Sequence, residues 1–260
     1  MLSSLAAAVS AVPDGSTVYL GNFGAQLFAV GHELIRQRRR DLHVVLASGG
    51  ILLDDLIAEG VTRHVTLSHC WNPVGPVKTE HFQREAQEGR LHLCELSYGA
   101  LCSALHAAAQ DVPFTATTDL SGTDYLDPER NGGMLTTVRC EFGSATVVRA
   151  LAPDVAFVHV DTANRSGDGW LTQPTADALL AAQASRSTVL VAEHLGAGGG
   201  PATIPGLLVD AVVMCAGAVR PDGAAGRYAR DLEAYADYSR QAGTSDGRAS
   251  WRAAVAASRG

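Results

Sequence analysis

Residues 89–124 read GRLHLCELSYGALCSALHAAAQDVPFTATTDLSGTD, and this stretch decides the fold. Within it, Leu91–Leu96 alternates apolar and polar residues, the period-two pattern of a strand that buries one face. Ser97 is then placed to cap a helix, whose apolar residues recur at helical spacing: Leu101, Leu105, Ala108 and Ala109. Open α/β sheets bind ligands where the carboxyl end of a strand meets the start of a helix. Glu95 and Tyr98 stand at this junction and are therefore candidate functional residues.

The rest of the chain repeats the alternation of strand and helix. Patterns of apolar residues predict strands at 17–20, 42–47, 61–67 and 115–118, and helices at 27–40, 52–59 and 79–88. From Ser121 the signals turn to loop. This order predicts an α/β fold with an open, mostly parallel sheet flanked by helices. We expect one main domain over 1–241, followed over 242–260 by a flexible hinge and a C-terminal helix that starts near Trp251.

Composition narrows the class of protein. The chain has 260 residues, of which 47% are hydrophobic, enough to bury a full core. Its formal net charge of -7 argues against binding to nucleic acid or to an anionic membrane. No apolar run is long enough to span a bilayer, and the first residues lack the basic region of a signal peptide. We therefore expect a cytoplasmic protein with no nucleic-acid or membrane partner.

The cysteines are odd in number and widely spaced: Cys70, Cys94, Cys102, Cys140 and Cys215. They form no CxxC pair, and no set of cysteine and histidine has the spacing of a structural zinc site. Free thiols in a reducing compartment and no bound metal are the expectation.

Three motifs, in the same order, resemble the alpha subunit of family I CoA-transferases. The first is carried by Glu95, Gly99, Leu101, Ala108, Ala109, Pro113 and Phe114. The second is P-D-V-A-x-x-H-V at 153–160, and the third is I-P-G-x-x-V-D-A-V-V at 204–213. The resemblance implies the CoA-transferase (Rossmann-like) fold and an enzyme that acts on acyl-CoA or carboxylate substrates, with coenzyme A bound as the acyl-CoA and without a metal.

The resemblance also implies a partner. In family I enzymes a glutamate of the beta subunit forms a covalent glutamyl thioester, and this chain resembles only the alpha subunit. The nucleophile is therefore expected on a beta subunit, in a heterodimer or heterotetramer.

Several residues match positions that shape the substrate pocket in the family. Gly21, Asn22, Phe23 and Gly24 correspond to a G-G-F-G turn, with Asn22 in place of the second glycine. On the residues alone, the same stretch is also a tight strand-to-helix turn. His69 and Trp71 follow a strand and either line the pocket or cover the sheet, while Ser121 and Asp124 match a G-S/T-D segment.

Tyr98 and Glu95 are the candidate catalytic residues. The position of Tyr98 is often a Gln in the transferases. In related steroid-ring-cleaving CoA-ester hydrolases it is a Glu, which works with an Arg at the position of Thr118. This chain has neither Gln nor Glu at position 98 and no Arg at position 118. Tyr98 is therefore interpreted as a phenolic donor to a developing oxyanion. Glu95 is an alternative acid or base, or a structural residue.

His159 and Arg220 do not decide between the possible reactions. His159 is interpreted as a hydrogen-bonded core residue, with catalysis as the alternative. Arg220 replaces the usual His of an A-P-x-G-A-H-P motif and favours a carboxylate or phosphate partner. A CoA-ester hydrolase, a C–C bond-cleaving or otherwise diverged acyl-transfer enzyme, and a non-catalytic module that senses sugar phosphates are the competing hypotheses.

Overall fold

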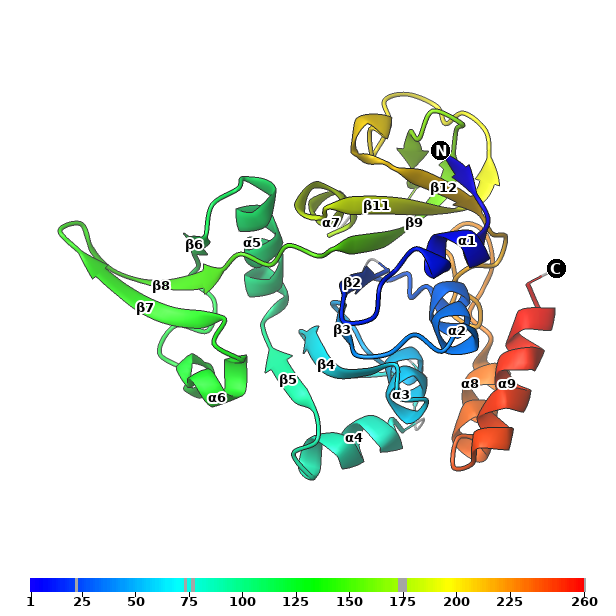
Figure 1. Cartoon of the computed structure of the whole chain (residues 1–260), viewed down its shortest axis with the longest axis horizontal. Coiled ribbons are helices and arrows are strands. Elements are labelled where there is room, and N and C mark those ends of the chain that lie inside the picture. Colours follow the sequence, from blue (N-terminus) through cyan, green and yellow to red (C-terminus); the bar gives the residue numbers. More distant parts are fainter. Residues whose placement is uncertain (22, 73, 76–77, 173–176, 260) are drawn as a thin grey trace.

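A mostly parallel sheet forms the centre of the computed structural model, which describes residues 1–21, 23–72, 74–75, 78–172 and 177–259 (Figure 1). Its described strands follow the order β1 (Leu2–Ser3), β12 (Ala211–Met214), β11 (Ser187–Leu195), β9 (Val155–Ala163), β2 (Thr17–Leu20), β3 (Leu42–Val45), β4 (Thr62–Leu67) and β5 (His92–Glu95). Neighbours in this order pair in parallel, whereas the short β10 (Gly169–Trp170) runs antiparallel to β9. The predicted α/β class is confirmed.

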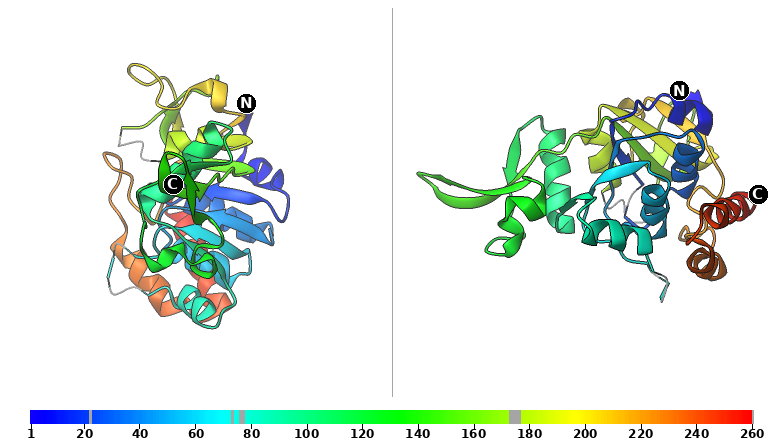
Figure 2. Two further views of the ribbon diagram at one scale, coloured as in Figure 1. Left: turned by 90° about the vertical axis from the view of Figure 1, so that its left-hand side faces the viewer. Right: turned by 60° about the horizontal axis from the view of Figure 1, so that its bottom comes forward.

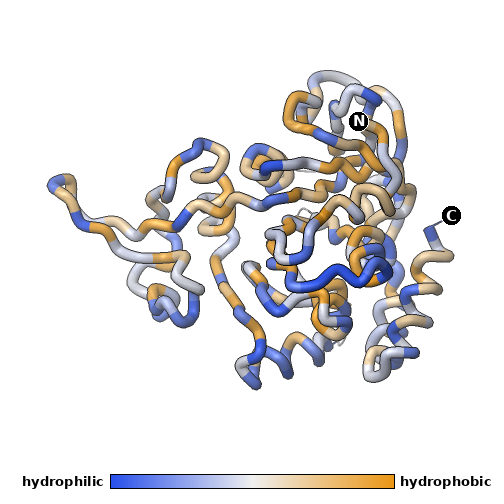
Figure 3. Tube along the Cα trace, in the orientation of Figure 1, coloured by the Kyte–Doolittle hydropathy of each residue, from blue (hydrophilic) through white to orange (hydrophobic). Residues whose placement is uncertain are grey.

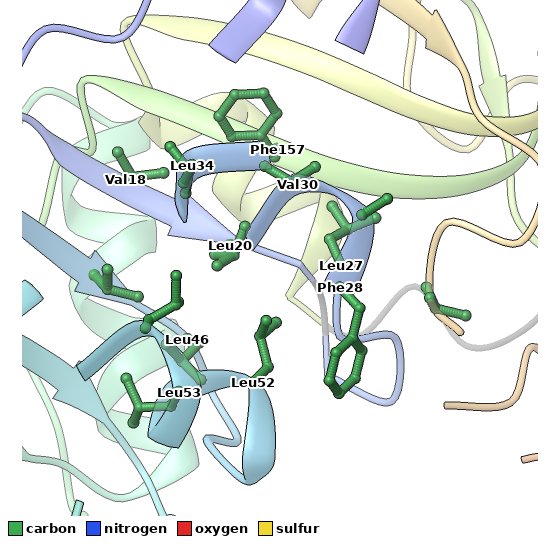
Figure 4. Close-up of a cluster of buried hydrophobic side chains, with 14 of the residues drawn as sticks. Val18, Leu20, Leu27, Phe28, Val30, Leu34, Leu46, Leu52, Leu53 and Phe157 are labelled. Atoms are coloured by element: carbon green, nitrogen blue, oxygen red, sulfur yellow. The ribbon is translucent and has the colours of Figure 1, made fainter. Parts of the chain in front are cut away.

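Each face of this sheet buries its own hydrophobic core, because neighbouring residues of a strand point to opposite faces. In β2, Val18 and Leu20 enter one core and Tyr19 the other. The first face is covered by α1 (Leu5–Ser10), α2 (Phe28–Arg36) and α3 (Ile51–Ala58), and the second by α5 (Tyr98–Ala109) and α7 (Ala178–Ala184). Figure 4 shows the first core around Leu20 and Phe157. Burial on both faces explains why the strands read as nearly continuous apolar runs.

The strand, cap and helix around residue 97 form as the sequence predicted. β5 ends at Glu95, and the Ser97 hydroxyl oxygen accepts a hydrogen bond of 2.9 Å from the backbone N–H of Ala100. This bond satisfies one of the free N–H groups in the first turn of α5. The helix predicted over 79–88 is α4 (Glu80–Gln87), which packs against α3.

A second, three-stranded sheet projects away from the main body (Figures 1 and 2). It consists of β6 (Phe114–Ala116), β8 (Gly143–Arg149) and β7 (Leu135–Cys140), with β8 in the middle, and η1 (Asp124–Leu126) and α6 (Pro128–Asn131) join β6 to β7. The strand predicted over 115–118 thus belongs to this sheet, and the loop predicted from Ser121 contains a hairpin. Figure 3 shows polar and apolar residues mixed along the hairpin formed by β7 and β8. Its sequence has no clear two-residue period, which is why the sequence did not predict these strands.

The C-terminal segment packs against the first face of the main sheet. It contains α8 (Leu232–Gln241) and α9 (Ser245–Ala257), whereas η2 (Gly206–Leu208) comes before β12 and its Leu208 packs against the second core. α9 begins earlier than predicted, and Trp251 is 1% exposed with its ring 4.8 Å from that of Tyr238 and 5.4 Å from that of His32. The segment predicted to be a hinge is therefore largely helical and joined to the main core. No helix among the described residues is both long enough and apolar enough to cross a membrane.

Three histidines line up across neighbouring strands: His43 in β3, His64 in β4 and His92 in β5. The rings of His43 and His64 stack with their centroids 3.7 Å apart. Nε2 of His43 lies 2.8 Å from the Thr66 hydroxyl oxygen. Burial, and secondly the charge of His64, lower the pKa of His43 to about 4.

Replacing Trp251 by Ala tests the docking of α9. We expect the free energy of unfolding to fall by about 3–5 kcal/mol, because the substitution leaves a cavity in the core and removes the ring contacts. Denaturant titration measures the change. Trp71→Ala is the matched control, since Trp71 is 64% exposed, and its stability should stay near that of the wild type. Equal losses in the two variants would contradict the packing of α9.

The lowered pKa of His43 predicts that the folded protein loses stability in acid. Between pH values of about 6.5 and 4 the unfolded chain binds a proton at His43 that the folded chain does not, so stability falls as the pH drops through this window. His43→Phe keeps a flat ring against His64 but cannot bind this proton. Over the same pH window its free energy of unfolding should therefore fall by up to about 3 kcal/mol less than that of the wild type. Denaturant titrations at the two ends of the window measure it. His106→Gln, at an exposed position of α5, should keep the wild-type pH dependence. An unchanged pH dependence in His43→Phe would refute the assignment.

Candidate active site

A cavity of about 170 Å³ opens at the carboxyl ends of β2, β3 and β4. β2 is the strand at which the chain order reverses, since β3 lies on one side of it and β9 on the other. Such a switch point is where open α/β sheets bind ligands. The cavity is lined by Leu20, Gly21, Phe23, Gly24, Gln26, Leu46, Ala47, Ser48, His69, Trp71, Asp222 and Arg230.

The turn after β2 forms one wall and requires glycine at position 21. Gly21 has φ +80°, and a Cβ there would lie 2.5 Å from the carbonyl oxygen of Ala25. The next described N–H, that of Phe23, donates to Oδ1 of Asp177 at 2.8 Å. Asp177 is fully buried before α7, and burial raises the pKa of its carboxyl group. A buried carboxylate thus holds the backbone of the turn. The predicted residue Asn22 lies outside the described residues.

Aromatic rings from three segments meet at this wall. The Phe23 ring lies 5.0 Å from that of Tyr98 and 6.2 Å from that of His69, measured between centroids. Phe23 is 47% exposed and Trp71 is 64% exposed, although both line the cavity. The structure therefore brings together five of the predicted substrate-side residues: Gly21, Phe23, Gly24, His69 and Trp71.

Tyr98 presents its ring to this wall, whereas its hydroxyl is buried. The groups that act on the hydroxyl are Asp177 and Cys102. Burial, followed by the charge of Asp177, raises the pKa of Tyr98 well above its ordinary value. The phenol therefore stays protonated. The contact that the structure shows for Tyr98 at this wall is the packing of its ring against Phe23. Its role as an oxyanion donor stays a prediction.

Glu95, Ser121 and Asp124 lie elsewhere. Glu95, at the end of the edge strand β5, lines a separate hollow of about 670 Å³ together with His92 and Arg130. Ser121 lines a hollow on the projecting sheet and donates a hydrogen bond of 2.9 Å to the Thr146 hydroxyl oxygen. Asp124 is exposed at the start of η1. Although these residues are close in sequence to the junction of β5 and α5, their side chains do not line the cavity.

The sequence did not indicate Asp222 and Arg230, the charged pair of the cavity. Nε of Arg230 donates to Oδ1 of Asp222 at 2.6 Å, and Asp222 is buried while Arg230 is about one-third exposed. Burial raises the pKa of Asp222 even though Arg230 opposes the shift. Both residues follow the last main strand in an irregular segment without hydrophobic period. Only the adjacent Arg220 gave a signal there.

His159 is a buried, hydrogen-bonded residue, and this prediction is confirmed. Its Nε2 lies 3.1 Å from Oε1 of Glu193, in the neighbouring strand β11. Among the described residues, no three or more His, Cys, Asp or Glu side chains are grouped so that they would hold a metal ion.

Comparison with known proteins identifies the family. The model of the family Coenzyme A transferase matches residues 2–214. One subunit of the 3-oxoadipate CoA-transferase of Pseudomonas knackmussii is 30% identical over 235 residues, which cover 86% of this chain and 82% of that protein. The chain therefore belongs to the coenzyme A transferase family, and the predicted enzyme class and alpha-subunit type are confirmed.

Solved structures agree with this assignment. A chain of the decarboxylase AibA/AibB, solved as a variant, has a TM-score of 0.88 at 28% identity and matches over 98% of this chain and 97% of its own length. Glutaconate coenzyme A-transferase from Acidaminococcus fermentans has a TM-score of 0.87 at 21% identity, over 98% and 89% of the two chains, and shares the fold. Asp222 and Arg230 lie beyond the family match.

The Tyr98 ring and hydroxyl can be tested separately. Tyr98→Phe keeps the ring under Phe23, so we expect turnover of the assembled enzyme within about threefold of the wild type. Tyr98→Ala removes that support and should lower turnover about tenfold, which corresponds to roughly 1.4 kcal/mol. Steady-state assays measure both, and size-exclusion chromatography controls for assembly. A tenfold loss in Tyr98→Phe would instead assign the hydroxyl to the reaction.

Proposed function

We propose that this chain is the alpha subunit of a heteromeric CoA-transferase-like enzyme and forms the pocket for the acyl or carboxylate substrate. The observation that carries the proposal is the cavity at the switch point, which combines apolar and aromatic walls with Arg230. Pockets of this kind, with few polar groups in a mostly apolar lining, are typical small-molecule sites.

Arg230 is the residue that we propose to bind a carboxylate of the substrate. A guanidinium group offers a planar fork of donors that matches a carboxylate. Asp222 engages Nε of Arg230 and holds the side chain at the cavity. The pair therefore orients the substrate, while Leu20, Phe23 and Trp71 exclude water from its apolar part.

A partner subunit completes the site in this proposal. Two large aromatic side chains, Phe23 and Trp71, stand partly exposed at the cavity, as is common where a second protein surface will cover them. The relative in Pseudomonas knackmussii is named as one subunit of its enzyme, and the decarboxylase is named as AibA/AibB. No glutamate lies among the described lining residues, which is compatible with a glutamyl nucleophile on the beta subunit. The assembly would be a heterodimer or heterotetramer that binds acyl-CoA.

A second candidate reaction is cleavage of a C–C bond in an acyl-CoA. It is favoured by the similarity to the decarboxylase AibA/AibB, which extends over nearly the whole of both chains. Acceptor dependence separates the reactions: a transferase forms product only with a carboxylate acceptor, a decarboxylase releases CO₂ without one, and a hydrolase releases free CoA without one.

Arg230→Gln tests the substrate side of the proposal. We expect KM for a dicarboxylic substrate to rise tenfold or more with kcat nearly unchanged, because a hydrogen bond to a charged group contributes roughly 1.5–3 kcal/mol. The assay uses the chain co-expressed with its partner. Arg240→Gln is the matched control, since Arg240 pairs with Asp237 on the exposed side of α8. If the two variants show the same KM, Arg230 does not bind the substrate; if the chain alone has full activity, the partner role is refuted.

A further inference from the structure

Gln26 is a polar residue in the wall of the cavity at the switch point. It lies between the end of β2 and the start of α2, and its side chain is buried, with an exposed fraction of 9%. Neither the motif resemblance nor the charged pair of the cavity involves it. A few well-placed polar groups in a mostly apolar pocket fix the orientation of a ligand, so a buried amide at this wall is a candidate for contact with the substrate.

The nitrogen of the Gln26 amide is anchored to the backbone that follows β3. Its Nε2 donates a hydrogen bond of 3.3 Å to the carbonyl oxygen of Ser48, which also lines the cavity. Because a carbonyl oxygen can only accept, the nitrogen of the amide must be the atom that faces Ser48. Glycine at position 50 leaves room for the amide, since a Cβ at Gly50 would lie 3.2 Å from Nε2 of Gln26. This anchor restricts the rotation of the amide and so fixes the place of its oxygen.

The oxygen of the same amide, Oε1, is buried and accepts no hydrogen bond within the part of the chain that the structure describes. A buried acceptor without a donor is unfavourable, and most such atoms in folded proteins do have a partner. The cavity of about 170 Å³ has room for more than a single water molecule, whose share of liquid volume is about 30 Å³. A molecule bound in the cavity can therefore supply the donor that Oε1 lacks.

Gln26 and Arg230 provide two different polar contacts in one cavity. The guanidinium group of Arg230 carries only donors and suits a carboxylate, whereas Oε1 of Gln26 is an acceptor and suits an O–H group. Leu20, Phe23 and Leu46 line the same cavity and offer apolar contacts to a carbon chain. A short carboxylic acid that also carries a hydroxyl group matches all three kinds of contact.

We propose that Gln26 is a specificity-determining residue, whose amide oxygen accepts a hydrogen bond from a hydroxyl group on the acyl chain of the substrate. This inference rests on the proposed function, because it takes the cavity as the site of the acyl or carboxylate substrate. It goes further by ranking the substrates: an acid with a suitably placed hydroxyl group binds more tightly than the same acid without one. The reason is that the plain acid leaves Oε1 buried and without a donor in the complex.

Calorimetric titration of the chain co-expressed and purified with its partner tests this preference. The probes are two matched pairs of acids, succinate with malate and glutarate with 3-hydroxyglutarate, and the members of each pair differ only by one hydroxyl group. In at least one pair we expect the hydroxy acid to bind the wild type about tenfold more tightly, the effect of one hydrogen bond to a buried acceptor. Gln26→Leu has no acceptor at this place and should bind that hydroxy acid no more tightly than the plain acid. Gln26→Met gives the same test if the leucine variant does not fold.

Two further variants serve as controls. Gln83→Leu makes the same exchange at an exposed position of α4 and should keep the wild-type preference. Arg230→Gln should weaken the binding of both members of a pair by the same factor, because it removes the contact to the carboxylate and leaves Oε1 of Gln26 in place.

The outcomes separate the role of Gln26 from the proposed function. Equal affinities within both pairs for the wild type, or a hydroxyl preference that persists in Gln26→Leu and Gln26→Met, would overturn the role of Gln26; weaker binding by Arg230→Gln would then still support the cavity as the substrate site. A preference that disappears in Gln26→Leu, with no effect of Arg230→Gln, would refute only the assignment of the carboxylate to Arg230. Absence of saturable binding of all four acids would overturn both.

Discussion

The parallel pairing of β2 with β9 on one side and β3 on the other is the constraint on which the rest of this structure depends. β2 is short, and its residues are apolar on both faces, so it is stable only between two neighbours and two helical layers. The order of the chain reverses at this strand, and open α/β sheets bind ligands at such a switch point. The cavity occupies this edge of the sheet.

The cavity is assembled from distant parts of the chain. The turn after β2 is held from beneath by the carboxylate of Asp177, which lies more than a hundred residues later. On the opposite wall, Asp222 and Arg230 come from the segment after β12. Asp161 and Glu193, adjacent on β9 and β11, fix that segment by binding Arg227 and Tyr228. Paired strands thus place the charged residues of the cavity through hydrogen bonds at their ends.

Most arginines in residues 215–260 pair with a carboxylate. Arg248 and Arg252 attach α9 to Glu59 and Asp55 of the α3 region, and these partly buried pairs compensate one another. Burial raises the pKa of Asp55 to about 7, an effect that its arginine neighbours oppose. In the part of the chain that the structure describes, Arg220 and Arg259 form no ion pair.

Hydrophobic period and capping, which depend on neighbouring residues, were sufficient to predict the α/β class, the main parallel strands before residue 100 and the Ser97 cap of α5. The motif resemblance correctly indicated the family. Local patterns did not predict the second sheet, because β6, β7 and β8 are partly exposed and lack a strict two-residue period. They also did not indicate Arg230, or show that Glu95 and the Tyr98 hydroxyl would turn away from the cavity. Those facts depend on which face of an element each neighbour covers, and contacts between residues far apart in the chain decide that.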